Sequence, residues 1–128
     1  MKTPMCAALA ALVLAGCGQA QPKAQDKYAG LEQQILDWRT GLRASDPACS
    51  AKADACTAFE VGCKGERPIT SAEAAKGMTA KVVVAMSWTA LDPKSGVASP
   101  VAGVKQFEKI SGAWTSHAVA PVNLSTCG

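Results

Sequence analysis

The residues with the widest choice of chemistry in this chain are its six cysteines. Four of them, Cys49, Cys56, Cys63 and Cys127, lie in the part of the sequence that can form a domain. Thiol redox catalysis and structural zinc sites favour close Cys-x-x-Cys pairs, whereas six residues lie between Cys49 and Cys56 and again between Cys56 and Cys63. If the chain is exported, as its N-terminus indicates, four cysteines are most simply two structural disulfides.

Chain geometry narrows the three possible pairings. In one straight helix, cysteines seven positions apart lie ~10.5 Å apart along the axis, beyond the ~7 Å limit for a bridge. Cys49–Cys56 or Cys56–Cys63 can therefore form only if the chain bends between the two cysteines, and Asp46-Pro47 with Ser50 makes the first interval the better candidate. We favour Cys49–Cys56 with Cys63–Cys127, which the chain-entropy treatment credits with ~2.5 and ~4 kcal/mol.

Catalysis by a histidine has a single candidate, His117. As a general base it would need Ser116, Ser87 or Ser99 within hydrogen-bond reach and an acid to orient it. The sequence contains no nucleophile elbow, phosphate loop, His-Glu metal motif or nucleotide fingerprint. We interpret His117 as a surface or half-buried sheet residue and predict no catalytic residue, no metal site and no cofactor.

The carboxylates and tryptophans each allow two interpretations. The acids fall mostly on predicted polar helix faces or in turns, which favours a solvated surface over paired catalytic carboxylates. The tryptophans Trp38, Trp88 and Trp114 could line a binding cleft, but each lies on an apolar stripe, which favours core packing.

Composition excludes further classes. Apolar residues make up 48% of the chain and charged residues 18%, which excludes disorder for most of it. The formal charge of +3 is spread singly among acids, so the clustered basic face of a nucleic-acid binder is absent from the sequence.

The N-terminus carries the most specific signal. Lys2 precedes an apolar segment, residues 6–15, which is too short to span a membrane, and Leu14-Ala15-Gly16-Cys17 follows. This tetrapeptide resembles the lipobox of bacterial lipoproteins. The resemblance implies cleavage before Cys17, diacylglycerol on its sulfur and commonly a third acyl chain, such as palmitate, on its amino group. Two or more acyl chains anchor a protein stably to a bilayer.

The same resemblance implies a location. In the enteric sorting rule an Asp after the lipidated cysteine retains a lipoprotein at the inner membrane, and here Gly18 follows instead. We expect a lipid-anchored protein of the bacterial cell envelope, in the inner leaflet of the outer membrane and facing the periplasm. We predict a signal peptide over residues 1–16, a lipidated cysteine and Gln/Ala-rich tether over 17–25, and one domain over 26–128.

Helix signals come first in that domain. Asp26 can cap a helix whose apolar stripe is Tyr28, Leu31, Ile35, Trp38 and Leu42. A second helix capped by Asp54 would place Cys56, Phe59 and Cys63 on one face, although the alternation of Phe59, Val61 and Cys63 would equally suit a strand; we favour the helix. Thr70 and Glu73 form a capping box for a short helix over residues 71–76.

Strand signals follow. Val82, Val84, Met86 and Trp88 alternate within residues 80–91, which predicts a central antiparallel strand. Further strands are expected over residues 103–110 and 113–120. We predict an α+β domain with N-terminal helices on a meander of three or four strands. Residues 107–114 resemble the late hairpin of cystatin-like and NTF2-like folds, and residues 70–88 resemble small bacterial lipoproteins of no known activity.

Function is expected to be binding. We predict a non-catalytic binding or assembly subunit that contacts the bilayer through Cys17 and an envelope protein through its domain. The alternative is a small inhibitor of an exported hydrolase of the protease or lysozyme type. Its inhibitory element would be the loop over residues 92–100, and the candidate interaction residues are Asp92, Pro93, Lys94, Ser95 and Gly96.

Overall fold

A computed structural model describes residues 26–128 of the chain. The predicted signal peptide, the tether and Cys17 lie outside the described residues. The elements are α1 (Leu31–Ser45), α2 (Pro47–Ser50), β1 (Cys56–Glu66), α3 (Ser71–Ala75), β2 (Met78–Leu91), β3 (Ala98–Ile110) and β4 (Ala113–Ala118). This order confirms the predicted α+β class, with N-terminal helices followed by an antiparallel meander.

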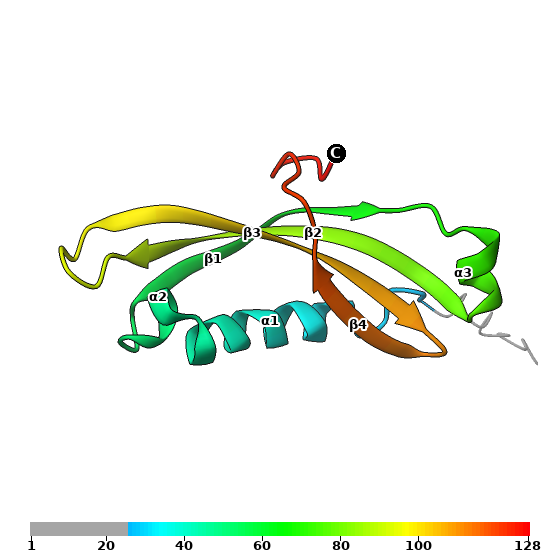
Figure 1. The fold of residues 1–128 in the computed structure, drawn as a ribbon, viewed down its shortest axis with the longest axis horizontal. Coiled ribbons are helices and arrows are strands. Elements are labelled where there is room, and N and C mark those ends of the chain that lie inside the picture. Colours follow the sequence, from blue (N-terminus) through cyan, green and yellow to red (C-terminus); the bar gives the residue numbers. More distant parts are fainter. Residues whose placement is uncertain (1–25) are drawn as a thin grey trace, which may run out of the picture.

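The four strands form one sheet in sequence order. β2 and β3 make a long hairpin that pairs from Leu91↔Ala98 to Met78↔Ile110. β4 is shorter and pairs only with the last part of β3, from Lys105↔Ala118 to Ile110↔Ala113. The hairpin therefore extends beyond both the helix and β4, as Figure 1 shows.

One face of the sheet carries the main core, because α1 lies across it (Figure 1). The predicted stripes meet here. Leu31, Ile35 and Trp38 from α1 pack with Val82, Val84, Met86 and Trp88 from β2 and with Phe107 from β3. The helix stripe and the central strand are thus confirmed.

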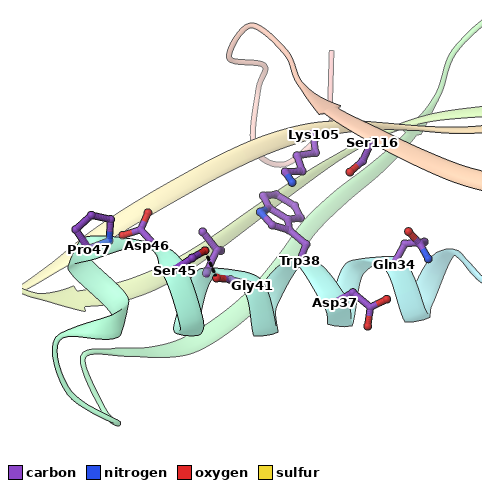
Figure 2. A pocket seen from close by; sticks show the side chains of 10 residues that line it. Gln34, Asp37, Trp38, Gly41, Ser45, Asp46, Pro47, Lys105 and Ser116 are labelled. Carbon is purple, nitrogen blue, oxygen red and sulfur yellow. Dashed lines mark hydrogen bonds between the residues drawn. The ribbon is translucent and has the colours of Figure 1, made fainter.

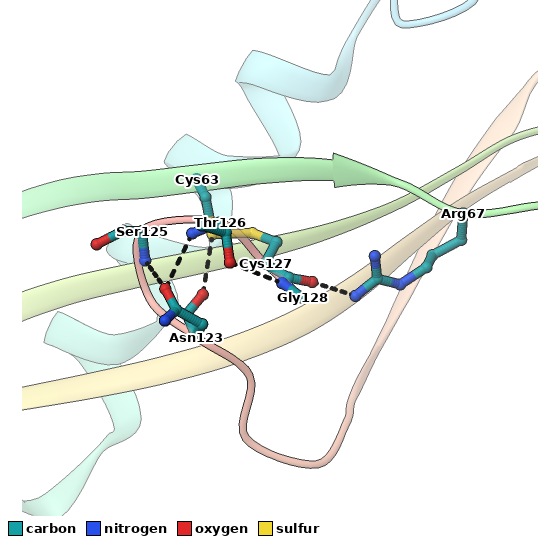
Figure 3. Close-up of a disulfide and its surroundings, with 7 residues drawn as sticks. All are labelled: Cys63, Arg67, Asn123, Ser125, Thr126, Cys127 and Gly128. Atoms are coloured by element: carbon teal, nitrogen blue, oxygen red, sulfur yellow. Dashed lines mark hydrogen bonds between the residues drawn. A yellow bond between two sulfur atoms is a disulfide. The ribbon is translucent and has the colours of Figure 1, made fainter.

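The opposite face is covered differently, by the C-terminal tail. Cys127 is fully buried there against Val83 and Ala85 of β2. The tail is held by the Cys63–Cys127 disulfide and by a hydrogen bond from the guanidinium of Arg67 to the carbonyl oxygen of Cys127 (Figure 3). A turn at Asn123 shapes it, since the Asn123 side chain accepts the Ser125 and Thr126 amide hydrogens.

Both predicted disulfides are present. Cys49–Cys56 joins α2 to the start of β1 with a Cα–Cα distance of 4.9 Å, and Cys63–Cys127 has a distance of 5.7 Å. The predicted bend between Cys49 and Cys56 lies over residues 51–55, where the Ala55 amide donates to the Lys52 carbonyl oxygen. Before it, the Asp46 side chain accepts the Ala48 amide hydrogen and caps α2.

The helix favoured for the segment after Asp54 is wrong, because Cys56–Glu66 is strand β1. Paired with β2, β1 places Cys56 opposite Ala90 and Cys63 opposite Ala85, five residues apart along β2. An odd separation directs the two cysteines to opposite faces of the sheet. One disulfide can therefore tie down α2 and the other the tail, which a shared helix face would not allow.

Some predicted boundaries also shift. α1 begins at Leu31 rather than after Asp26, because Gly30 has φ of 90° and breaks the helix there. Asp26 instead closes a preceding turn by accepting the Tyr28 amide hydrogen at 3.0 Å. The capping box of α3 is confirmed, with Thr70 and Glu73 bonding reciprocally.

Strand β3 begins at Ala98, so the predicted loop over residues 92–100 is reduced to a turn over 92–97. Among the described residues, no helix has the length and apolar content needed to cross a bilayer.

Candidate binding groove

A groove of about 580 Å³ separates the C-terminal half of α1 from the β3–β4 part of the sheet. Figure 2 shows Lys105 and Ser116 above the helix, with β3 continuing past the end of β4. The lining residues are Gln34, Asp37, Trp38, Gly41, Leu42, Ser45, Asp46, Pro47, Lys105 and Ser116.

The floor of the groove is aromatic and aliphatic. Trp38 is 8% exposed, and its ring centroid lies 6.2 Å from that of Phe107. The Lys105 ammonium lies 5.6 Å from the Trp38 ring centroid, in cation–π range. Leu42, one helical turn further on, is half-buried and also lines the groove. The floor therefore offers an apolar side chain a place to pack.

The helix separates charges between its two flanks. Asp37 and Asp46 line the groove, and Asp37 accepts a hydrogen bond from the Gln33 amide at 2.8 Å. Arg39 and Arg43 lie on the other flank, with their guanidinium carbons 5.5 and 5.0 Å from the centre of the Phe59 ring. The groove flank of α1 is consequently acidic.

This groove was not predicted from the sequence. The apolar periodicity placed Trp38 in the core, which is correct, but one edge of its ring also forms the groove floor. Asp37 was assigned to a plain polar face. A sequence signal was present in Gly41, a glycine in the interior of an amphipathic helix, where no atom lies within 4 Å of an added Cβ.

The structure does not assemble the serine–histidine pairs that catalysis would require. His117 is exposed on β4 opposite Gln106. Ser116 precedes it on the strand and so points to the other face. Ser87 lies opposite Ala102, four residues along β3 from Gln106, which is ~13 Å. Ser99 lies opposite Ala90, on the face that carries the core.

The tryptophans and acids have structural roles. Trp88 stacks on Phe59 with 5.7 Å between ring centroids, and the Trp114 indole donates to the Ala29 carbonyl oxygen at 2.9 Å. Three carboxylates pair with lysines, in Lys27–Glu66, Lys64–Glu32 and Lys81–Glu73. Over residues 26–128 no group of three or more His, Cys, Asp or Glu residues could hold a metal ion.

The predicted interaction residues, Asp92 to Gly96, form an exposed turn at the tip of the β2–β3 hairpin (Figure 1). Asp92 orders this turn, because one carboxylate oxygen accepts the Ser95 and Lys94 amide hydrogens at 2.7 and 2.9 Å. These two backbone hydrogen bonds lower the pKa of Asp92. The turn is thus held in one shape by hydrogen bonds within itself.

A second hollow, of about 450 Å³, lies at the other end of α1. Tyr28, Leu31 and Val82 line it, together with the ion-paired Glu32, Lys64 and Glu66. Three of its four charged side chains are in ion pairs, the fourth being Asp26, which makes it the weaker candidate for a binding site.

Comparison of the chain with protein-family profiles, with characterised proteins and with solved structures gives no match.

Proposed function

We propose that this chain is an acyl-anchored lipoprotein of the bacterial cell envelope whose domain acts by binding another envelope protein, without catalysis. The lipobox-like Leu14-Ala15-Gly16-Cys17 supports the anchor. The absence of an Asp at position 18 supports the outer membrane, with the domain facing the periplasm.

The groove between α1 and β3 carries the binding proposal. It combines an apolar floor, Trp38 and Leu42, with the carboxylates Asp37 and Asp46 on one side and Lys105 above. An apolar floor with a polar, charged rim is typical of protein-binding surfaces. In the described part of the chain, His117 and its candidate serine partners are dispersed over the two faces of the sheet.

The test is a membrane pull-down with mild crosslinking in the native host, using the acylated protein and mass spectrometry. We expect one stoichiometric partner. Asp37→Arg should remove it, because the charge on the groove flank is reversed. Thr40→Arg is the matched control, since Thr40 is an exposed α1 residue that does not line the groove. A partner insensitive to both would place binding on another surface.

The hairpin tip favours a second candidate function, inhibition of an exported hydrolase. Protease inhibitors commonly present a pre-ordered protruding loop, and here the Asp92 side chain orders the turn at the end of the long hairpin. This function predicts that the captured partner is a hydrolase. Lys94→Ala or Asp92→Ala should then release it, and Asp37→Arg should not.

We also propose that the helix and the sheet form a cystatin-like fold. A helix across a curved antiparallel meander supports a cystatin-like arrangement. Such folds host many functions, so the assignment adds nothing to the choice between a binding subunit and an inhibitor.

A further inference from the structure

Strand β3 has one edge that no strand of the domain covers along part of its length. β2 pairs with β3 from Ala98 onward, whereas β4 pairs with β3 only from Lys105 onward. Over residues 98–104, β3 is therefore hydrogen-bonded on one side only in the described structure.

The direction of the free backbone groups follows from the hairpin turn. Ser111 and Gly112 both have positive φ, 50° and 82°, which makes a type I′ turn closed by Ile110 and Ala113. The backbone groups of Ile110 thus point toward β4. No register shift interrupts β3 on that side, so every second residue back to Ala98 points the same way.

Pro100 agrees with this alternation. A proline has no N–H to give to a ladder, and prolines in sheets occur with that side at an open edge. Pro100 shares the parity of Ile110, so its missing N–H faces the open side and its pairing with Thr89 is undisturbed. The backbone groups of Ala98 and Ala102 face the open side too.

This edge carries little of the usual protection. Exposed edges are normally blocked by charged side chains, prolines or bulges. Residues 98–104 read Ala-Ser-Pro-Val-Ala-Gly-Val, without a charge, and Pro100 is the one blocking feature. Val101 is 37% exposed.

The groove adjoins this edge, because Lys105 lines it and a Cβ added to Gly103 would lie 3.0 Å from Cζ2 of Trp38, which forms its floor. Its upper wall is formed by Lys105 and Ser116, at the point where β4 ends, and its lower wall is α1 (Figure 2). A strand added in line with β4 would bond to β3 and direct alternate side chains onto Trp38 and Leu42.

We propose that the free edge of β3 over residues 98–104 accepts an extended segment of the partner protein by strand addition, with alternate side chains of that segment filling the groove. This inference rests on the proposed binding function and names the form of its ligand.

The groove also specifies the chemistry of the segment. Small or medium apolar side chains at every second position fit the Trp38–Leu42 floor. Asp37 and Asp46 favour basic side chains on the same face of the segment. Asp46 directly follows α1, nine residues after Asp37, and the helical rise over that length is ~13 Å, which a strand covers in about four residues. An even spacing keeps both basic side chains on the groove side.

A second copy of this chain is a less suitable occupant. If two β3 edges paired in antiparallel over residues 98–104, the chain before Ala98 of one copy would lie beside Lys105 of the other. That position is already taken, because Ala118 of β4 pairs with Lys105. The turn over residues 92–97 would collide with the end of β4, whereas a single extended segment avoids this.

The test uses the acylated protein in detergent micelles and a displayed library of random nonapeptides. We expect selected peptides to alternate apolar residues with period two and to carry Lys or Arg on the apolar face. A synthetic peptide of the selected sequence is then titrated by fluorescence anisotropy against wild-type protein, Ala102→Pro and Ala102→Ser.

Ala102→Pro removes one outward N–H and leaves the β2 side intact, so it should weaken binding about tenfold, the equivalent of one hydrogen bond. Ala102→Ser, the matched control, should stay within about twofold. A folding-independent check is an N-methyl scan of the peptide against wild-type protein. Methylation at alternate residues should abolish binding, and methylation between them should not.

Several results would overturn the proposal. Three of them concern the peptide: no peptide is selected, the N-methyl scan shows no period of two, or a correctly folded Ala102→Pro variant binds the peptide as well as wild type does. The other two identify a different occupant of the edge. Competition by a peptide of residues 18–25 would identify the chain's own N-terminal segment, and concentration-dependent dimers that Ala102→Pro dissociates would identify a second copy. A pulled-down partner insensitive to Ala102→Pro removes strand addition and leaves the binding function standing. Selection of a peptide without any pulled-down partner removes the binding function and leaves strand addition standing.

Discussion

At the scale of single residues, two glycines near the groove differ in the space available for a side chain. A Cβ on Gly103 would lie 3.0 Å from Trp38 Cζ2 and 3.1 Å from Trp88 Cη2, whereas one on Gly41 would meet nothing within 4 Å. We expect Gly103→Ala to destabilise the domain by about 1–3 kcal/mol through overpacking. Gly41→Ala should stabilise it by about 1 kcal/mol through helix propensity. Urea unfolding checks both, and an unaltered Gly103→Ala midpoint would mean that the tryptophans can move aside.

A second prediction concerns Glu73, which bonds to Lys81 and to the Thr70 amide. The Lys81 side chain and then the Thr70 backbone lower the pKa of Glu73 to about 2. Because the pKa is lower when folded, the stabilisation is present above the ordinary pKa, 4.5, and is lost as pH falls toward 2.

Glu73→Gln should therefore be less stable than wild type at pH 6, and the difference should shrink as pH falls from 4.5 and vanish only below about 2. Glutamine still serves the capping box, so the variant isolates the charge. Urea midpoints at several pH values provide the measurement. A difference independent of pH would contradict the assignment to ionisation.

At the scale of elements, the two disulfides should contribute unequally. Cys63–Cys127 spans 64 residues and Cys49–Cys56 spans seven. We expect Cys63→Ser with Cys127→Ser to cost about 4 kcal/mol and the other double variant about 2.5 kcal/mol, on chain entropy. Urea unfolding of both gives the comparison. If removing Cys49–Cys56 lowered the free energy of unfolding more than removing Cys63–Cys127, strain or packing would outweigh loop length.

Local sequence patterns correctly predicted the elements whose apolar residues all face one core or whose signal is confined to a few neighbouring residues. The stripe of α1 and the alternation of β2 each meet one large core, and the capping box of α3 is purely local. The pattern over β1 did not decide between a helix and a strand, because Phe59 and Val61 contact the core cluster whereas Cys63 packs on the opposite face, and bulges interrupt the register between them. Its strand form is decided by pairing with β2.

The candidate groove could not be predicted from the sequence, because it too depends on how the strands pair. The groove depends on β4 ending before β3 does, and this mismatch in strand length appears only when the register is known. The sequence analysis placed residues 98–100 in the predicted loop and began the next strand only at residue 103, whereas β3 begins at Ala98. The sequence could identify Trp38 as buried, but not the open edge above it.

At the scale of the whole molecule, attachment to the membrane depends on one predicted modification. We expect Cys17→Ala to abolish acylation and release the domain from membranes, because the acyl chains on Cys17 are the proposed anchor. Cys6→Ala is the matched control, since Cys6 lies in the segment predicted to be removed. Fractionation with metabolic labelling by a fatty acid measures both. Membrane retention of Cys17→Ala would contradict the lipobox assignment.

The Cys63–Cys127 bond also closes a covalent ring that contains β2, β3 and β4. The exposed tip over residues 92–97 lies within that ring and is the part of the sheet most open to a protease. A single cut there leaves both pieces joined through sulfur, so nothing is shed from the chain. The nicked protein keeps its sheet together until a reductant reaches a disulfide whose Cys127 is fully buried.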